Sequence, residues 1–219
     1  MFLGHYGIGL AATRVSPRTG LGTLLAASVL PDLLWPVFLL TGLEKVVITT
    51  SSPIFVPLEF TSYPYSHSLV MTAVWGALLA SGVYAYKRDT RGAVVCFLLT
   101  LSHWLCDLAV HLPDLQIAPG IEARFGFGLW RSLPLSIALE GGILIIGTVI
   151  YAGSTVGLDR RGSFGFAFLV LSFCVVGAMA FTGTPPPGIP ALAFTSELQW
   201  LFILLGAWTD RHRRLRMGV

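Results

Sequence analysis

A run of apolar residues near the middle of the chain ends in three side chains that can bind a metal ion. They are His103, Asp107 and His111, each four residues from the next. In a helix, residues four apart lie on the same face, so these side chains would stack on consecutive turns. Imidazole and carboxylate groups at this spacing can bind one ion together. The alternative is a helix end that reaches water, where the three side chains are only solvated.

Four other apolar segments each carry one imidazole or carboxylate: His5, Asp32, His67 and Glu140. Measured from the expected span ends, Asp32, His103 and Glu140 all lie about 12–14 Å below the same membrane boundary, because a helix rises about 1.5 Å per residue. Such groups are costly inside a membrane and are usually functional there. We therefore expect these four residues and His103 to meet inside one bundle, mostly in its outer half.

Each candidate also has a purely structural alternative. His5 could lie at the membrane interface, and His67 could belong to a helix-starting turn. Asp32 could cap a helix that restarts after a proline. Glu140 could form a hydrogen bond to a neighbouring helix, and Asp114 is typical of a loop turn.

The composition is that of a membrane protein. Of 219 residues, 54% are hydrophobic and only 11% are charged, whereas soluble domains carry roughly a quarter charged residues. We expect one integral membrane domain over residues 1–219. Cys96, Cys106 and Cys174 form no CxxC motif, so free buried thiols are expected rather than disulfides.

The predicted fold is an all-α, polytopic transmembrane helical bundle with about six spans plus a short N-terminal helix over residues 2–13. The expected spans are residues 19–41, 62–86, 92–112, 132–153, 163–181 and 191–209. The candidate motifs lie within residues 1–142, so the spans over 163–181 and 191–209 carry none of them. Glu197 and Gln199, near the start of the last span, are expected at the interface. The loop over residues 42–61 is expected to fold onto the membrane surface or over a cavity.

Basic residues predict the orientation. With six spans, eleven Lys and Arg residues fall on one side and three on the other. Because basic residues favour the cytoplasmic side, the turns near residues 14–18, 87–91 and 158–161 and the C-terminus should be cytoplasmic. The short basic tail is interpreted as a topological signal rather than as a nucleic-acid site.

Several motifs, in their order along the chain, resemble the bacterial inner-membrane proteins called membrane-bound metal-dependent hydrolases. The shared motifs are Gly4-His5-Tyr6, Pro31-Asp32, Ser66-His67-Ser68 and Ser102-His103-Trp104-Leu105-Cys106-Asp107. A closer subgroup is similar also at Tyr65, His111-Leu112-Pro113-Asp114, Gly128-Leu129-Trp130 and Glu140.

The resemblance implies a ligand set, which consists of His5, Asp32, His67, His103 and Asp107. The wider family is similar in motif style to zinc-dependent phospholipase C and its nuclease relatives, which act on phosphoesters. This chain departs from the commoner pattern, because Ser62 stands where a further His is usual.

These observations favour a metal-dependent hydrolase of the bacterial cytoplasmic (inner) membrane. We expect a divalent metal, with Zn first and Mn or Fe as alternatives, and membrane lipid as partner and substrate, with no nucleic acid. His111 or Asp114 could shuttle protons at the rim, and Glu140 could be a ligand or the base. One alternative is a non-enzymatic transporter or ion- or proton-binding protein that uses the same carboxylates; the sequence lacks the internal repeat that many transporters show. Another is a structural subunit whose polar residues join helices.

Overall fold

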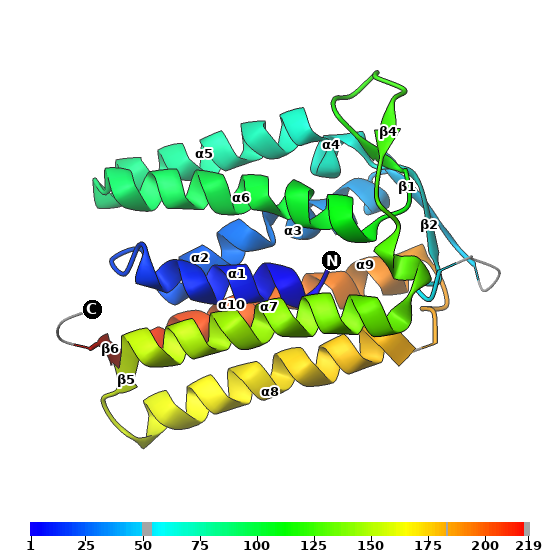
Figure 1. Cartoon of the computed structure of the whole chain (residues 1–219). Coiled ribbons are helices and arrows are strands. Elements are labelled where there is room, and N and C mark those ends of the chain that lie inside the picture. The colour runs from blue at the N-terminus through cyan, green and yellow to red at the C-terminus, as the bar shows by residue number, and fades with distance from the viewer. Residues whose placement is uncertain (50–53, 183, 217–219) are drawn as a thin grey trace.

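The computed structural model describes residues 1–49, 54–182 and 184–216. Over these residues the chain is an all-α helical bundle with short two-stranded sheets at its ends, which confirms the predicted fold class (Figure 1). The helices are α1 (Leu3–Ala11), η1 (Ala12–Arg14), α2 (Leu21–Ser28), α3 (Leu30–Leu40), α4 (Pro64–His67), α5 (Leu69–Lys87), α6 (Thr90–Val110), η2 (Leu129–Arg131), α7 (Leu133–Ser154), α8 (Arg160–Thr182), α9 (Ile189–Glu197) and α10 (Gln199–Arg211). The strands are β1 (Lys45–Ile48), β2 (Leu58–Ser62), β3 (Leu115–Gln116), β4 (Arg124–Phe125), β5 (Thr155–Gly157) and β6 (Arg213–Leu215).

The long helices have the length and composition of membrane spans. Among the described residues, five qualify: α5, α6, α7, α8 and the run Ile189–Arg211 formed by α9 and α10. Helices α2 and α3 make a sixth span if the pair is counted as one, with a bend of 56° between them. Large apolar side chains on α7 and α8, such as Ile145, Val149 and Phe164, are exposed on the outside of the bundle, as expected for a surface in contact with lipid. The protein is therefore an integral membrane protein.

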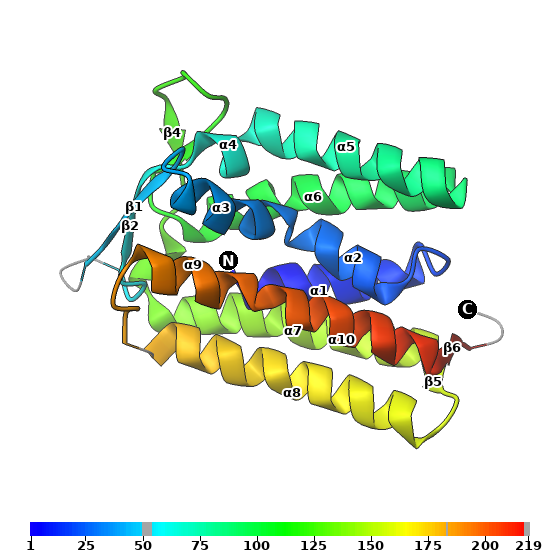
Figure 2. The same cartoon turned by 180° about the vertical axis from the view of Figure 1, so that it is seen from behind.

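The short helix α1 lies in the middle of the bundle. Figures 1 and 2 show α5 and α6 as an antiparallel pair on one side, α7 and α8 on the other, and α1 with α2 between them. A side chain at Gly7 would collide with the backbone of Ile143 and Leu144, and one at Gly147 would collide with the backbone of Gly7. Glycine at both positions lets α1 pack directly on α7.

A proline separates α2 from α3. Pro31 has no N–H, so it cannot donate to the carbonyl of Ala27 four residues earlier. The Thr100 hydroxyl on α6 lies 3.0 Å from that carbonyl oxygen and 3.1 Å from the Cys96 carbonyl oxygen, so the two carbonyls share its one hydrogen. The Ala27 carbonyl therefore has a donor despite the break in the helix. The contact with Thr100 also ties the bend to α6.

The two ends of the bundle differ in character. At one end the Lys87 amine donates to the carbonyl of Thr19, the Asp210 carboxylate accepts from the Leu21 N–H at 3.2 Å, and β5 pairs with β6. The other end carries the antiparallel β1–β2 hairpin and the small β3–β4 pair. The loop expected over residues 42–61 therefore contains a hairpin, and its Phe60 packs against Trp35.

Candidate metal centre

Two predicted ligands lie on α6, one turn apart and both 1% exposed. The Asp107 Oδ2 atom is 3.1 Å from the Nε2 atom of His103. The predicted helix face is thus present for these two residues. The third member, His111, is not on it, because α6 ends at Val110 and His111 has extended backbone angles, φ −62° and ψ 150°. Pro113 explains the early end, since a proline disfavours helical conformation just before it.

The His103 ring has a defined orientation. Its Nδ1 atom lies 3.0 Å from the Ser28 carbonyl oxygen at the end of α2. A carbonyl can only accept, so Nδ1 donates, and Nε2 of the neutral ring carries the lone pair. The Nε2 atom is buried and has no hydrogen-bond partner among the described residues. It faces Asp107 and lies 3.7 Å from the Asp32 Oδ1 atom. A ring held by its other nitrogen, with a free lone pair facing carboxylates, fits a metal ligand.

Helix α1 supplies His5. Its ring stacks on that of His103, with the ring centres 3.7 Å apart, and its Nε2 atom is 3.0 Å from Asp107 Oδ1. The same carboxylate oxygen accepts from the amine of Met1 at 2.5 Å. The Nδ1 atom of His5 is buried and finds no hydrogen-bond partner in the described part of the chain. Hydrogen bonding within the protein therefore leaves one buried nitrogen on each of these two imidazoles unpaired.

The remaining two predicted ligands come from α3 and α4. Asp32 lies in the first turn of α3, just after the break, and its Oδ1 atom is 3.3 Å from the Nε2 atom of His67. His67 ends α4, is 6% exposed, and lies 3.9 Å from Asp107 Oδ2. Asp32 is the most accessible residue of the group, at 22% exposure. The helix does restart near Asp32, yet its carboxylate faces the histidines.

The structure thus brings together the five residues of the predicted ligand set. Two groups of three have ligand atoms within 4.8 Å of one another: His5, His103 and Asp107, and Asp32, His67 and His103. The two groups share His103. Imidazole nitrogens and carboxylate oxygens without thiolates suit Zn, Mn or Fe. This buried His/Asp cluster could hold a metal ion.

Glu140 lies beside the cluster, and neither group includes it. Its side chain on α7 is 1% exposed, and its Oε2 atom accepts from the N–H groups of Phe2 and Leu3 at 2.7 and 2.8 Å. These amides begin α1 and have no partner within that helix, so Glu140 pairs them and complements the positive end of the helix dipole. This is the contact to a neighbouring helix that the sequence left as an alternative. A role in catalysis stays a prediction.

His111 and Asp114, the predicted proton carriers, form a second polar cluster. The His111 Nδ1 atom is 3.0 Å from Asp114 Oδ1, and the Tyr63 hydroxyl donates to the same oxygen at 2.5 Å. Burial, reinforced by the nearby Asp114 charge, raises the pKa of the Tyr63 phenol well above its ordinary value. The ring centres of Tyr63 and His67 are 5.3 Å apart, so this cluster borders the candidate metal centre.

Three residues that the sequence did not propose as site residues make buried contacts around the candidate metal centre or with α1. They are Tyr63, Glu44 and Gln199. Tyr63 and Glu44 were assigned only to a span start and a loop, and their local spacing gives no signal because their partners are distant in sequence. Gln199 was expected at the interface, but it is only 9% exposed and accepts from the Tyr6 hydroxyl at 2.8 Å. That bond ties the last span to α1. Glu197, in contrast, accepts from the Trp200 indole at 2.9 Å in an exposed position.

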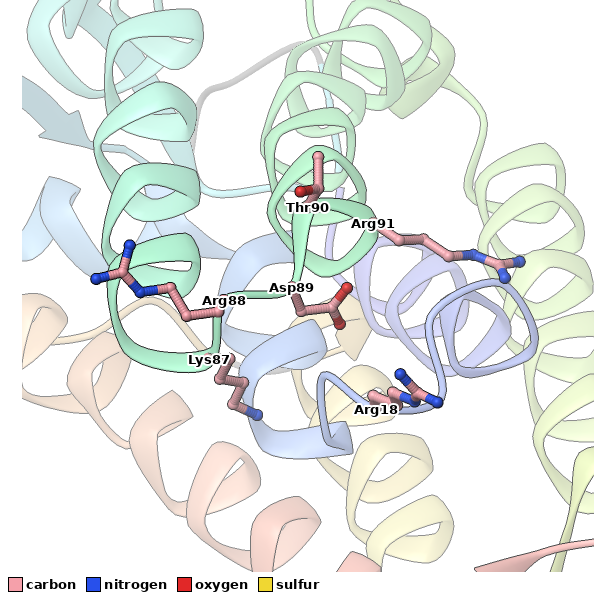
Figure 3. A pocket seen from close by; sticks show the side chains of 6 residues that line it. All are labelled: Arg18, Lys87, Arg88, Asp89, Thr90 and Arg91. Carbon is pink, nitrogen blue, oxygen red and sulfur yellow. The ribbon is translucent and has the colours of Figure 1, made fainter.

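An open pocket lies at the opposite end of the bundle. It is lined by Arg18, Lys87, Arg88, Asp89, Thr90 and Arg91. Figure 3 shows the side chains of Arg88 and Arg91 extending away from each other, so they do not close around one ligand. The candidate site for chemistry is therefore the buried His/Asp cluster.

Comparisons of the chain with protein-family models, with curated proteins and with solved structures find no match.

Proposed function

We propose that the protein is a membrane-embedded metal-dependent hydrolase that cleaves a lipid phosphoester. The observation that carries the proposal is the convergence of three imidazoles and two carboxylates from α1, α3, α4 and α6 in the interior of an apolar bundle. Two of the imidazoles leave a buried ring nitrogen without a hydrogen-bond partner among the described residues. Buried charged groups are expensive unless they are paired or bind a metal.

The candidate site residues have two proposed roles: some bind the metal ion, and others transfer protons. A bound divalent metal would lower the pKa of its water and polarise the phosphoryl oxygen. His5, Asp32, His67, His103 and Asp107 would hold the ion, and the partial exposure of Asp32 marks the side from which substrate would approach. His111 and Asp114 would carry the proton to or from the reacting oxygens, with Tyr63 holding the Asp114 carboxylate in place.

The surroundings support a lipid substrate. The cluster lies near the hairpin end, since Tyr63 separates β2 from α4 and its His67. The helices around it expose apolar side chains, so a lipid could approach from the membrane. The motif resemblance to membrane-bound metal-dependent hydrolases agrees with this assignment. We place the protein in the bacterial cytoplasmic membrane, with the hairpin end outward and the C-terminus cytoplasmic, because of the basic-residue asymmetry.

The test measures metal and activity together. Detergent-purified protein is analysed for Zn, Mn and Fe, and headgroup release is followed in mixed micelles of phosphatidylglycerol and phosphatidylethanolamine. His103→Ala should lose both metal and hydrolysis, because both ligand groups contain His103. His212→Ala should retain both, since His212 pairs with Asp159 at the other end of the bundle.

Two results would overturn the proposal. Wild-type protein that binds none of the three metals would remove the metal centre. Wild-type protein that binds metal, cleaves no lipid phosphoester and moves the ion into sealed vesicles would instead establish the transporter alternative.

A further inference from the structure

Glu44 is a charged residue in a connecting segment, yet its side chain is only 2% exposed. The chain turns sharply after α3, where Gly42 has φ +76°, a conformation that glycine adopts readily. The Glu44 N–H then donates to the Phe38 carbonyl at 3.1 Å, which holds the turn against α3. The turn directs the Glu44 carboxylate to the start of α4.

Glu44 makes three hydrogen bonds to the segment that carries His67. Its Oε1 atom accepts from the N–H groups of Tyr65 and Ser66, each at 2.8 Å. Its Oε2 atom accepts from the Ser66 hydroxyl at 2.6 Å. A buried carboxylate with three donors is well paired, so its burial is not a defect of packing.

The third bond determines how the His67 ring is held. A hydroxyl has one hydrogen, and that of Ser66 is donated to Glu44. The Ser66 oxygen can therefore only accept from His67 Nδ1, which lies 2.7 Å away. His67 Nδ1 carries the proton in consequence, and its Nε2 lone pair faces Asp32 and Asp107.

We propose that Glu44 is a positioning residue of the metal centre, which acts through Ser66 to fix the tautomer and orientation of His67. Nothing in the local sequence points to this role, and the hydrogen bonds of the Glu44 side chain in the described part of the chain go to Tyr65 and Ser66, not to a candidate ligand. The proposal rests on the proposed metal site. Carboxylates that orient ligating histidines typically contribute 10–100-fold in metal affinity, by order of magnitude.

The experiment measures Zn²⁺ affinity of metal-free, detergent-purified protein by competition with a chromophoric chelator. Glu44→Gln keeps the shape and one oxygen for the α4 amides, but its NH₂ group cannot accept the Ser66 proton. We expect Zn²⁺ affinity to fall roughly 10–100-fold. Glu59→Gln, the same change at an exposed position of the β1–β2 hairpin that follows Glu44, should leave the affinity unchanged.

A double-mutant comparison separates positioning from general support of the fold. In a His67→Ala background, Glu44→Gln should produce no further loss of Zn²⁺ affinity, because both changes act on the same ligand. Ser66→Ala, which leaves both amide bonds to Glu44 in place, should reproduce the loss. It also serves as the test if Glu44→Gln does not fold.

The outcomes are distinguishable. If wild-type protein binds no Zn²⁺, the proposed function itself fails. If wild-type protein binds Zn²⁺ and either Glu44→Gln or Ser66→Ala binds it equally well, the positioning role is wrong. The positioning role is also wrong if Glu44→Gln lowers Zn²⁺ affinity by the same factor in the wild-type and His67→Ala backgrounds. The effect of Glu44 would then not depend on His67.

Discussion

The Asp107 carboxylate has different partners on its two oxygens. Oδ1 meets the Met1 amine and His5, and Oδ2 faces His103 and His67. This arrangement places a negative charge on a side chain that is only 1% exposed, where it must be paired to be tolerated. Asp32 adds a second carboxylate and the Met1 ammonium adds one positive charge, so with neutral histidines the cluster carries a net formal charge of −1, which attracts a cation.

Substitutions of Glu140 can distinguish a role in stabilising the fold from a role in the reaction. Glu140→Ala would leave the Phe2 and Leu3 amides buried without an acceptor. We expect the free energy of unfolding to fall by about 1–3 kcal/mol, measured by thermal or denaturant unfolding in detergent. Glu140→Gln retains an oxygen for both amides and should recover most of that stability.

The Gln variant also tests the predicted catalytic role. If it keeps its Zn²⁺ content but loses hydrolysis, Glu140 contributes charge to the reaction. An Ala variant as stable as the wild type would show that the contacts to α1 contribute nothing to the fold.

The bend between α2 and α3 brings Asp32 of α3 to the cluster. Because α2 ends at Ser28, the Ser28 carbonyl accepts from His103 Nδ1. The bend also turns the Asp32 carboxylate towards His67. The helix restart that the sequence left as an alternative at Asp32 is explained by Pro31, because a proline cannot donate the helical hydrogen bond; Pro36, in contrast, lies inside α3. The sequence could not predict the 56° bend or the Thr100 bond to Ala27, which depend on a helix far away in sequence.

Pro31→Ala should weaken the metal centre without abolishing the fold. Alanine supplies the missing N–H, so Ala27 gains a helical donor and α2 can continue straight into α3. Asp32 would then move away from His67, and we expect Zn²⁺ affinity to fall about tenfold or more. Chelator competition measures the change, and Pro187→Ala in an exposed turn is the control. Unchanged affinity in Pro31→Ala would mean that the proline does not set the position of Asp32.

Apolar composition and basic turns sufficed to predict the helical bundle and its approximate span boundaries. The five members of the cluster were also identifiable, because imidazoles and carboxylates stand out in apolar segments. Their mutual geometry was not, since it depends on how α1, α3, α4 and α6, which are far apart in sequence, pack together. The contacts of Tyr63, Glu44 and Gln199 were missed for the same reason: each partner is brought close only by the fold.

The two ends of the bundle differ in basic residues, and this difference predicts its orientation in the membrane. The segments near residues 14–18 and 87–91 and the C-terminal strand gather at one end of the molecule, away from the hairpins (Figure 1). Eleven of the fourteen Lys and Arg residues belong to the segments of that end, so we expect it to be cytoplasmic. In a Cys174→Ser background, which removes the exposed native thiol, cysteines are introduced singly as Thr90→Cys and Pro187→Cys.

A membrane-impermeant maleimide added to intact cells should label Pro187→Cys and not Thr90→Cys. Disruption of the membrane should make both positions reactive, and this serves as the control for accessibility. Labelling of Thr90→Cys alone would invert the orientation and place the hairpin end in the cytoplasm. Labelling of both in intact cells would be incompatible with a bundle whose two ends lie on opposite sides of one membrane. Because the candidate metal centre lies nearer the hairpin end, the same result decides from which side substrate reaches Asp32.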